Sequence, residues 1–222
     1  MNELTPPHAL ILSGGWPGHQ PHVFAAIISD MLEHAGFSVT RADTLDVLED
    51  AERLTQYTLI VPNWTMGRIG ETQSKHLRRA VQSGVGLGGF HGGMGDAFRD
   101  DPAYQFMVGG QFVAHPGGIR DYRVDITTQD HPITRGASGF DVRSEQYYMH
   151  VDPSNTVLAT TTFDGQDTPW TAGVVMPVAW TRMHGQGRVF YSSVGHDPAE
   201  FNDPAVASLH LRGLLWAAGR LT

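Results

Sequence analysis

The stretch Gly84–Phe98, GVGLGGFHGGMGDAF, places a single histidine, His91, in a glycine-rich turn that follows a short apolar run. This pattern predicts a buried strand, a sharp turn and the start of a helix. In hydrolase-like α/β folds the central residue of such a turn is strained, and glycines flank it because larger neighbours would clash. Gly89–Gly93 has this spacing. Two interpretations stay open: a functional turn that presents His91, or a tight turn that happens to carry a histidine.

The segments before this turn alternate between strand and helix patterns. Strands are predicted at Ala9–Leu12, Phe37–Ala42 and Leu59–Val61, the last closed by Pro62, and helices from Pro21 to just before Gly36 and over Gly70–Ser83. Such an alternation predicts a mostly parallel sheet with helices on both faces. Ligands bind such sheets at the carboxyl ends of the strands. The loops after these strands should therefore bring His19, Trp64 and His91 to one rim.

The second half of the chain favours strands. Alternating polarity and β-branched residues predict extended segments at Tyr122–Thr127, Val157–Thr162, Val174–Thr181 and Val189–Ser193. We expect part of this half to extend the sheet with antiparallel strands. A final helix is predicted from Pro204 to just before Gly219, because Asn202 or Asp203 can cap it. The sequence contains no repeat or linker, and residues 1–222 are predicted to form one domain.

The composition narrows the classes of partner and of chemistry. The 222 residues carry a formal net charge of −8, so we expect neither nucleic acid nor a membrane as partner. The absence of cysteine excludes disulfides, thiolate metal ligands and a cysteine nucleophile. The N-terminal segment has no basic region followed by a long apolar one, which predicts a cytoplasmic protein. The oligomeric state is left open, with a homo-oligomer as one alternative.

Six motifs, in order along nearly the whole chain, carry a resemblance to a known family. They are Gly88–Gly93, Gly109–Phe112 with His115, Asp130–Ile133, Glu145 with Tyr147 and Tyr148, Gly187–Tyr191 with Gly195 and His196, and Trp216–Gly219. In this order they resemble the trehalose-utilisation (ThuA-like) family. The resemblance implies the fold of class I glutamine amidotransferases, a flavodoxin-like three-layer α/β sandwich, and a link to disaccharide metabolism.

The similarity to glutamine amidotransferases ends at the turn. Those enzymes carry a cysteine there, served by a histidine and an acid late in the chain, whereas this chain has His91 at the turn and His196 with Glu200 late. Imidazole does not replace the sulfur of a glutaminyl thioester. We therefore expect that the chain is not a glutamine amidotransferase.

The residues selected for catalysis are His91, Glu145 and His196, as acid, base or metal-ligating groups. His91, His115 and His196 are the predicted ligands of a divalent metal such as zinc, because neutral imidazoles suit borderline ions. No local H-x-E or H-E-x-x-H spacing is present, so these ligands would meet only in the fold. The alternatives are histidines that bind loop backbone, and acid/base catalysis without a metal.

A sugar is the expected small-molecule ligand. Aromatic side chains pack on the apolar faces of sugar rings and polar groups bind the hydroxyls. The predicted sugar contacts are Trp16, His19, Trp64 and Tyr147. The leading hypothesis is a cytoplasmic hydrolase or isomerase that acts on trehalose or a related disaccharide, in native or oxidised form. Two alternatives stay open: a non-catalytic sugar-binding or regulatory module, and a metal-assisted hydrolase of an ester or amide.

Overall fold

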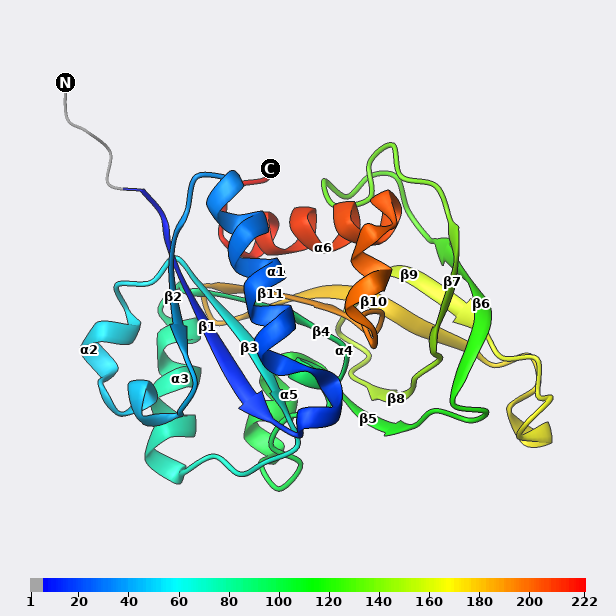
Figure 1. Ribbon diagram of the computed structural model, residues 1–222, viewed down its shortest axis with the longest axis horizontal. Helices are drawn as coiled ribbons and strands as arrows, with labels where there is room; N and C mark the ends of the chain where they lie inside the picture. The colour runs from blue at the N-terminus through cyan, green and yellow to red at the C-terminus, as the bar shows by residue number, and fades with distance from the viewer. Residues whose placement is uncertain (1–5) are drawn as a thin grey trace.

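A nine-stranded sheet runs through the centre of the computed structural model, which describes residues 6–222 (Figure 1). Its strands lie in the order β2-β1-β3-β4-β11-β10-β9-β6-β7. The first five are parallel: β2 (Ser38–Ala42), β1 (His8–Gly15), β3 (Leu59–Thr65), β4 (Gly86–Phe90) and β11 (Gly187–Ser192). The others add as antiparallel strands: β10 (Val175–His184), β9 (Thr156–Thr162), β6 (Ile119–Ile126) and β7 (Phe140–Glu145). A separate antiparallel pair consists of β5 (Gly110–Ala114) and β8 (Tyr148–Val151).

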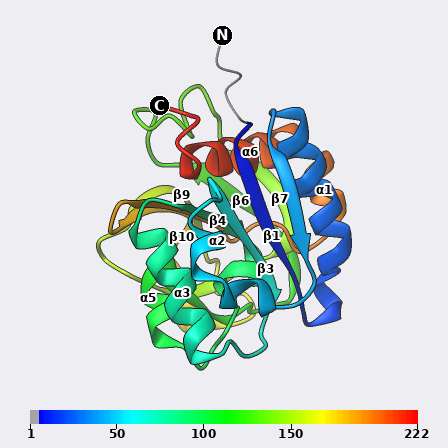
Figure 2. The same ribbon diagram turned by 90° about the vertical axis from the view of Figure 1, so that its left-hand side faces the viewer.

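Helices cover both faces of the parallel half of the sheet (Figures 1 and 2). One face carries α1 (Pro21–His34) and α6 (Pro204–Ala217), and the other carries α2 (Ala51–Leu54), α3 (Glu71–Gln82) and α5 (Pro102–Val108). In β1, Ala9 and Ile11 join the core beneath α1, while Leu10 and Leu12 join the core beneath α3. Successive side chains of a strand face opposite sides, so this apolar run is buried on both faces. The predicted flavodoxin-like three-layer sandwich is confirmed.

Short helical segments lie in the connecting loops: η1 (Pro17–His19), η2 (Asp46–Glu49), α4 (His91–Gly95), η3 (Pro169–Thr171) and η4 (Pro198–Asn202). The final helix begins as predicted, because the Asp203 side chain accepts a hydrogen bond from the N–H of Ala205 and Pro204 fills the first position. Among residues 6–222, no helix is both long enough and apolar enough to cross a membrane. Residues 1–5, which belong to the predicted domain and to the N-terminal segment used to predict location, lie outside the described part of the chain.

The third strand differs from its prediction, because it does not end at Pro62 but continues to Thr65. Strand β4 pairs with β3 only at Leu59 and Ile60, whereas β1 accompanies β3 to its last residue. Beyond Ile60, β3 therefore has a single neighbour in the sheet, and a residue without an N–H is tolerated at such an edge. The extension carries Thr65 to the carboxyl end of the sheet and shortens the loop that was predicted to follow Pro62.

Candidate active site

The turn after β4 holds His91 in the strained conformation that its glycine neighbours predict. The residue has a φ of +44° and is 1% exposed, and few residues other than glycine adopt such a φ. Its Nδ1 lies 2.8 Å from the carbonyl oxygen of Ser193. A carbonyl only accepts hydrogen bonds, so Nδ1 carries a hydrogen, and Nε2 is the ring nitrogen that faces Glu145. The ring of Tyr147 stacks on the imidazole, with 4.1 Å between centroids.

The two glycines after His91 allow neighbouring loops to close over the turn. A Cβ on Gly92 would lie 2.5 Å from Cε1 of His19, and one on Gly93 would lie 3.0 Å from Cα of Asn63. Side chains at these positions would push the neighbouring loops away, so close approach of the backbone requires glycine. The glycine pair thus brings the loop that carries His19 against His91.

His19 comes from η1, directly after β1, and is 7% exposed. Its Nδ1 forms a 2.9 Å hydrogen bond with Oγ1 of Thr65, the last residue of β3. The rings of His19 and His91 lie 4.8 Å apart in an edge-to-face arrangement. The loops after β1, β3 and β4 therefore meet at one end of the sheet, as the strand order predicts.

Two later segments complete the site. His196 follows β11, the sheet neighbour of β4. Glu200, in η4, accepts hydrogen bonds from the N–H groups of Gly195 and Asp197, at 2.9 and 3.0 Å. These are the residues on either side of His196, so Glu200 holds the loop that presents this histidine. Glu145 is the last residue of β7, which contacts η4.

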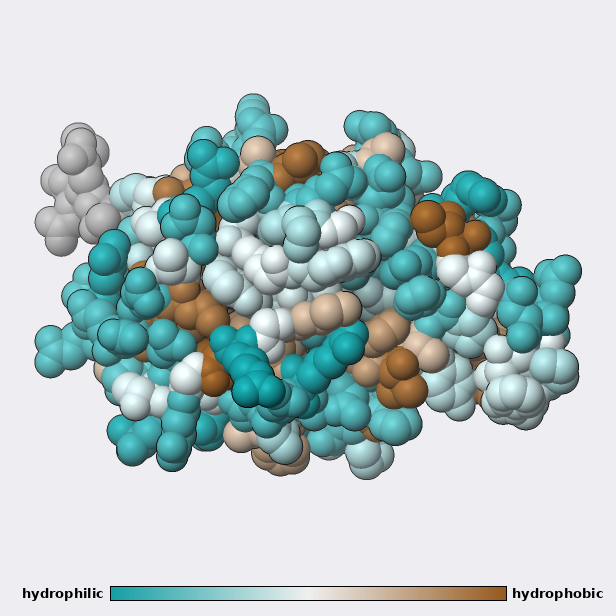
Figure 3. All heavy atoms as spheres, turned by 60° about the horizontal axis from the view of Figure 1, so that its bottom comes forward, coloured by the Kyte–Doolittle hydropathy of each residue, from teal (hydrophilic) through white to brown (hydrophobic). Residues whose placement is uncertain are grey.

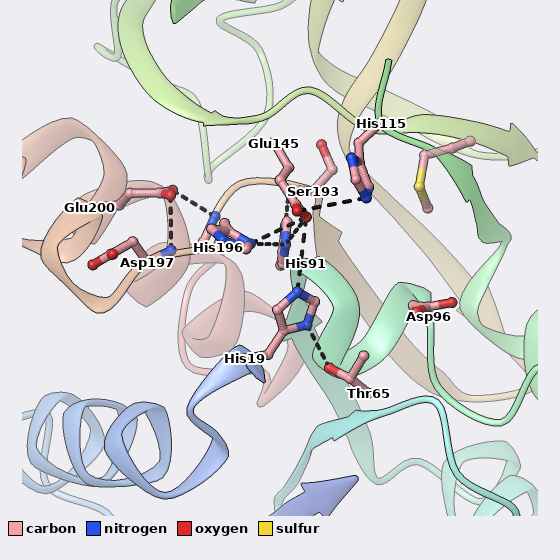
Figure 4. Close-up of polar contacts among 12 residues, drawn as sticks. His19, Thr65, His91, Asp96, His115, Glu145, Ser193, His196, Asp197 and Glu200 are labelled. Atoms are coloured by element: carbon pink, nitrogen blue, oxygen red, sulfur yellow. Dashed lines mark hydrogen bonds and ion pairs between the residues drawn. The ribbon is translucent and has the colours of Figure 1, made fainter. Parts of the chain in front are cut away.

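His19, His91, Glu145 and His196 each point one side-chain ligand atom at a common position, and these atoms all lie within 4.8 Å of one another (Figure 4). Oε2 of Glu145 is 3.2 Å from Nε2 of His91 and 3.2 Å from Nδ1 of His196. Those two nitrogens are 3.3 Å apart. Nε2 of His19 is 3.9 Å from the same carboxylate oxygen. In a tetrahedral zinc site with bonds of about 2.0–2.1 Å, neighbouring ligand atoms lie about 3.3 Å apart.

The electrostatics of this cluster hold two of its four groups, His19 and Glu145, in metal-ligating protonation states. Burial, reinforced by His91 and His196, lowers the pKa of His19 to about 3, so its imidazole is neutral near pH 7. Burial opposes ionisation of Glu145, but hydrogen bonds to His196 and His91 outweigh it and hold the pKa of this carboxyl below its usual range. The hydrogen bond to Glu145 raises the pKa of His196. Metal ligands must be deprotonated, and the structure supplies an ionised carboxylate beside a neutral imidazole.

The arrangement can hold a borderline divalent ion such as zinc. The outer nitrogens of two of the imidazoles are fixed, by Ser193 at His91 and by Thr65 at His19, as is typical of histidines that bind metals. Without a metal, the same contacts can pass a proton between His196 and Glu145.

The geometric ligand set shares His91 and His196 with the predicted one, lacks His115 and adds His19 and Glu145. His19, predicted as a sugar contact, belongs to the group of four, whereas His115, predicted as a ligand, does not. Nε2 of His115 lies 3.7 Å from Oε1 of Glu145, the other carboxylate oxygen, and its side chain is 42% exposed. His115 therefore occupies the solvent side of the cluster.

The predicted aromatic contacts lie in three different environments. Trp16 is 45% exposed, with its ring 4.9 Å from that of His19. Trp64 is partly buried and packs over Gly14 and Gly67, where an added Cβ would lie 2.5 Å from its ring. Tyr147 is 3% exposed beneath His91. Sugar binding by these residues stays a prediction, and Trp16 is the one with an accessible ring beside the cluster.

Fold and site together define an α/β sandwich protein with a histidine-rich cluster at the carboxyl end of its parallel strands. The sequence profile of the ThuA family, described as trehalose utilisation, matches residues 8–217. The chain therefore belongs to the trehalose-utilisation family, and the resemblance carried by its motifs is confirmed. A search among curated proteins finds no match.

Solved structures share the fold. A ThuA-like protein from Bacteroides uniformis ATCC 8492 has a TM-score of 0.79 and 18% identity, over 98% of this chain and 94% of that one. A ThuA-like protein from Parabacteroides merdae ATCC 43184 has a TM-score of 0.78 and 20% identity, over 98% and 92%. A cytoplasmic protein from Salmonella typhimurium LT2 has a TM-score of 0.63 and 14% identity, over 96% and 98%. At these identities the likeness shows the fold alone, and a fold does not fix a function.

Proposed function

We propose that this protein is a cytoplasmic, metal-dependent, carbohydrate-processing enzyme that acts on trehalose or a related disaccharide, in native or oxidised form. The observation that carries the proposal is the convergence of three imidazoles on one carboxylate at the carboxyl end of the sheet. Membership of the family associates the chain with trehalose utilisation. The metal, the reaction, the substrate and the location are parts of the proposal.

The geometry of the cluster favours a reactive site over a purely structural one. The ligand atoms of His91, His196 and Glu145 form a nearly equilateral triangle with sides of 3.2, 3.3 and 3.2 Å. Nε2 of His19 is farther from the carboxylate, at 3.9 Å. Catalytic zinc sites keep a position for water or substrate and expand to five ligands. A divalent ion held here would supply a Lewis acid for a sugar oxygen or for water.

His115 is the residue best placed to exchange protons with solvent. Its imidazole lies on the solvent side of the cluster, 3.7 Å from Oε1 of Glu145. Imidazole is the side chain most often used as a general acid or base. We propose that His115 carries protons to and from the substrate, while the other oxygen of Glu145 would be one of the atoms that hold a metal.

The rim of the cluster suits a sugar. The exposed ring of Trp16 stands beside His19, with 4.9 Å between ring centroids. A sugar ring whose hydroxyl reaches the cluster would lie against this indole, and aromatic packing with a few polar groups is how sugar-sized ligands are bound.

A second candidate is acid/base catalysis without a metal. The observation that favours it is the 3.2 Å hydrogen-bonded pair of His196 and Glu145, which raises the pKa of the imidazole. Such a pair can hold a proton near neutral pH and deliver it to a glycosidic or carbonyl oxygen. The two candidates differ in whether activity depends on a bound ion.

The deciding measurement is the metal content of tag-free protein by inductively coupled plasma mass spectrometry. We expect one divalent ion per chain in the wild type and in H34A, a control at an exposed histidine of α1. H91A and H196A should hold at least about tenfold less, because each removes a ligand. Wild-type protein that stays metal-free after incubation with zinc or manganese would contradict the metal-dependent proposal.

Turnover separates an enzyme from a binding module. Metal-loaded wild type should convert trehalose or its oxidised derivative in an assay followed by NMR, and a chelator should abolish the reaction. Unchanged sugar recovered from a tight complex would instead identify a sugar-binding protein. Conversion that survives metal removal would favour the acid/base pair.

A further inference from the structure

A groove of about 440 Å³ lies directly beside the cluster, between β7 and the segment that runs from η4 into α6. His196 belongs to both places: its Nδ1 joins the cluster and its side chain also lines the groove. A molecule with one end at the cluster therefore has this groove as an adjoining space. Its other lining residues come from the start of β6, from β7, from η4 and from the start of α6.

The floor of the groove is apolar. Ile119 is 50% exposed there, although it is a large hydrophobic residue, and Val142 and Ala199 lie beside it. The face drawn in Figure 3 is mostly hydrophilic, with its apolar residues in separate small groups. A small apolar floor with polar surroundings matches a sugar ring, which has apolar faces and a hydroxyl edge.

The rim of the groove is acidic. Four carboxylates line it against one guanidinium: Asp141, Asp197, Glu200, Asp203 and Arg143. The guanidinium of Arg143 is paired with Asp121 at 2.9 Å and the carboxylate of Asp141 with Arg123 at 3.3 Å, both partners lying outside the groove. The acidic character of the rim therefore rests mainly on Asp197, Glu200 and Asp203. Three of the carboxylates are fixed by backbone N–H groups near the ends of η4 and α6. Their negative charges are therefore held in place by the fold.

We propose that this groove binds the second ring of a disaccharide whose first ring lies at the cluster, and that it selects uncharged sugars over phosphorylated or acidic ones. The inference rests on the proposed function and adds a substrate class to it. The carboxylates accept hydrogen bonds from sugar hydroxyls, while they repel a phosphate or carboxylate group brought to the same place. Asp141 and Ala199 are the specificity-determining positions, because both are exposed and neither touches the cluster.

The test measures binding of three probes to zinc-loaded protein by NMR titration: trehalose, glucose and trehalose 6-phosphate. Wild type should bind trehalose at least about tenfold more tightly than either other probe. Glucose lacks the second ring, and trehalose 6-phosphate carries a negative charge that the acidic rim repels. A199W fills the groove and should weaken trehalose binding about tenfold without changing glucose binding. D141K should tighten binding of trehalose 6-phosphate several-fold.

A matched control is A51W, which adds the same bulk at an exposed alanine of α2, near the opposite edge of the sheet from β7. It should leave all three affinities unchanged. Metal content is measured in every variant, so retention of zinc separates a failure of the groove from a failure of the proposed site. Equal affinity for trehalose and its phosphate, unchanged trehalose binding in A199W, or no trehalose binding to zinc-loaded wild type would each overturn the inference.

Discussion

At the scale of single residues, Gly92 decides whether His19 can reach the cluster. The His19 ring lies against this glycine, and a methyl group there would come within 2.5 Å of Cε1 and 2.6 Å of Nδ1. We predict that G92A displaces His19 and breaks its bond to Thr65. Loss of an interaction that orients a metal ligand typically lowers metal affinity about 10–100-fold. We expect a fall in zinc affinity of this size in G92A, measured by competition with a chromogenic chelator.

The control for this substitution is G70A, because the nearest atoms to an added methyl group there belong to the flexible side chain of Gln73, at 3.2 Å. Circular dichroism should show that both variants fold. If G92A binds zinc as tightly as wild type, His19 is not a ligand and the site reduces to the triangle of His91, His196 and Glu145.

The sequence could predict those site residues whose position follows from strand order. From the strand order, His19 and His91 were expected at one rim of the sheet, whereas His196 was selected through the family resemblance. The structure places His196 after β11, the parallel neighbour of β4. The role of His19 could not be predicted, because it depends on how far the loop after β1 folds over Gly92 and on the bond to Thr65. The part played by Ser193 is equally hidden, since a backbone carbonyl carries no signal in residue type.

At the scale of elements, η4 acts as the support of His196. The two carboxylate oxygens of Glu200 accept hydrogen bonds from the N–H groups of Gly195 and Asp197, the residues on either side of this histidine. Gly195 has a φ of +118°, which favours glycine at this position. E200Q keeps a single carbonyl oxygen, so one of the two bonds is lost. We predict a three- to tenfold fall in zinc affinity, about 0.7–1.4 kcal/mol, which is the size of one net hydrogen bond.

Isothermal titration calorimetry of E200Q beside E52Q, a substitution at an exposed residue of α2, measures this effect. Only E200Q should lose affinity, and E200D should not rescue it fully because the shorter side chain cannot span both N–H groups. Identical affinities in E200Q and wild type would show that the loop holds its shape without the carboxylate.

The elements that the sequence did not predict share a lack of apolar pattern. In β7 only Phe140 and Ser144 are buried, and in β5 no residue is. Strands at the margin of a sheet bury little, so their residues carry weak periodic signals. Helix α5 has seven residues, too few for a clear helical period. Both faces of the parallel strands are covered, and those strands were therefore the predictable part of the fold.

At the scale of the whole molecule, His210 links the stability of the core to pH. The residue lies in α6, 1% exposed, with its ring against Phe90 and Phe201. Burial lowers the pKa of this imidazole to about 4, although bonds to the carbonyls of Val206 and Val194 favour the proton. In the unfolded chain the ring titrates at its ordinary value of about 6.5. Between these values the unfolded state binds the proton and the folded state does not, so stability falls as pH falls.

Two site histidines act on the same balance with opposite signs. The lowered pKa of His19 adds a second loss of stability below about pH 6.5. The raised pKa of His196 contributes stability at low pH that disappears as pH rises through its folded value. The His196 contribution changes only above about pH 6.5, so between about pH 6.5 and pH 5 the losses from His19 and His210 add. The difference between wild type and a variant at His210 isolates the contribution of His210.

We therefore predict that the free energy of unfolding, measured in urea, decreases between about pH 6.5 and about pH 5 in wild type. The decrease should be roughly 2 kcal/mol larger than in H210Q, because one proton contributes about 1.4 kcal/mol per pH unit. Glutamine can donate to one of the two carbonyls but cannot titrate. H22Q, at an exposed histidine of α1, should keep the wild-type pH dependence. Parallel profiles for wild type and H210Q would contradict the assignment. If H210Q does not fold, an NMR titration of wild type decides the question, because the His210 ring must stay neutral down to about pH 5 for burial to outweigh its two carbonyl partners.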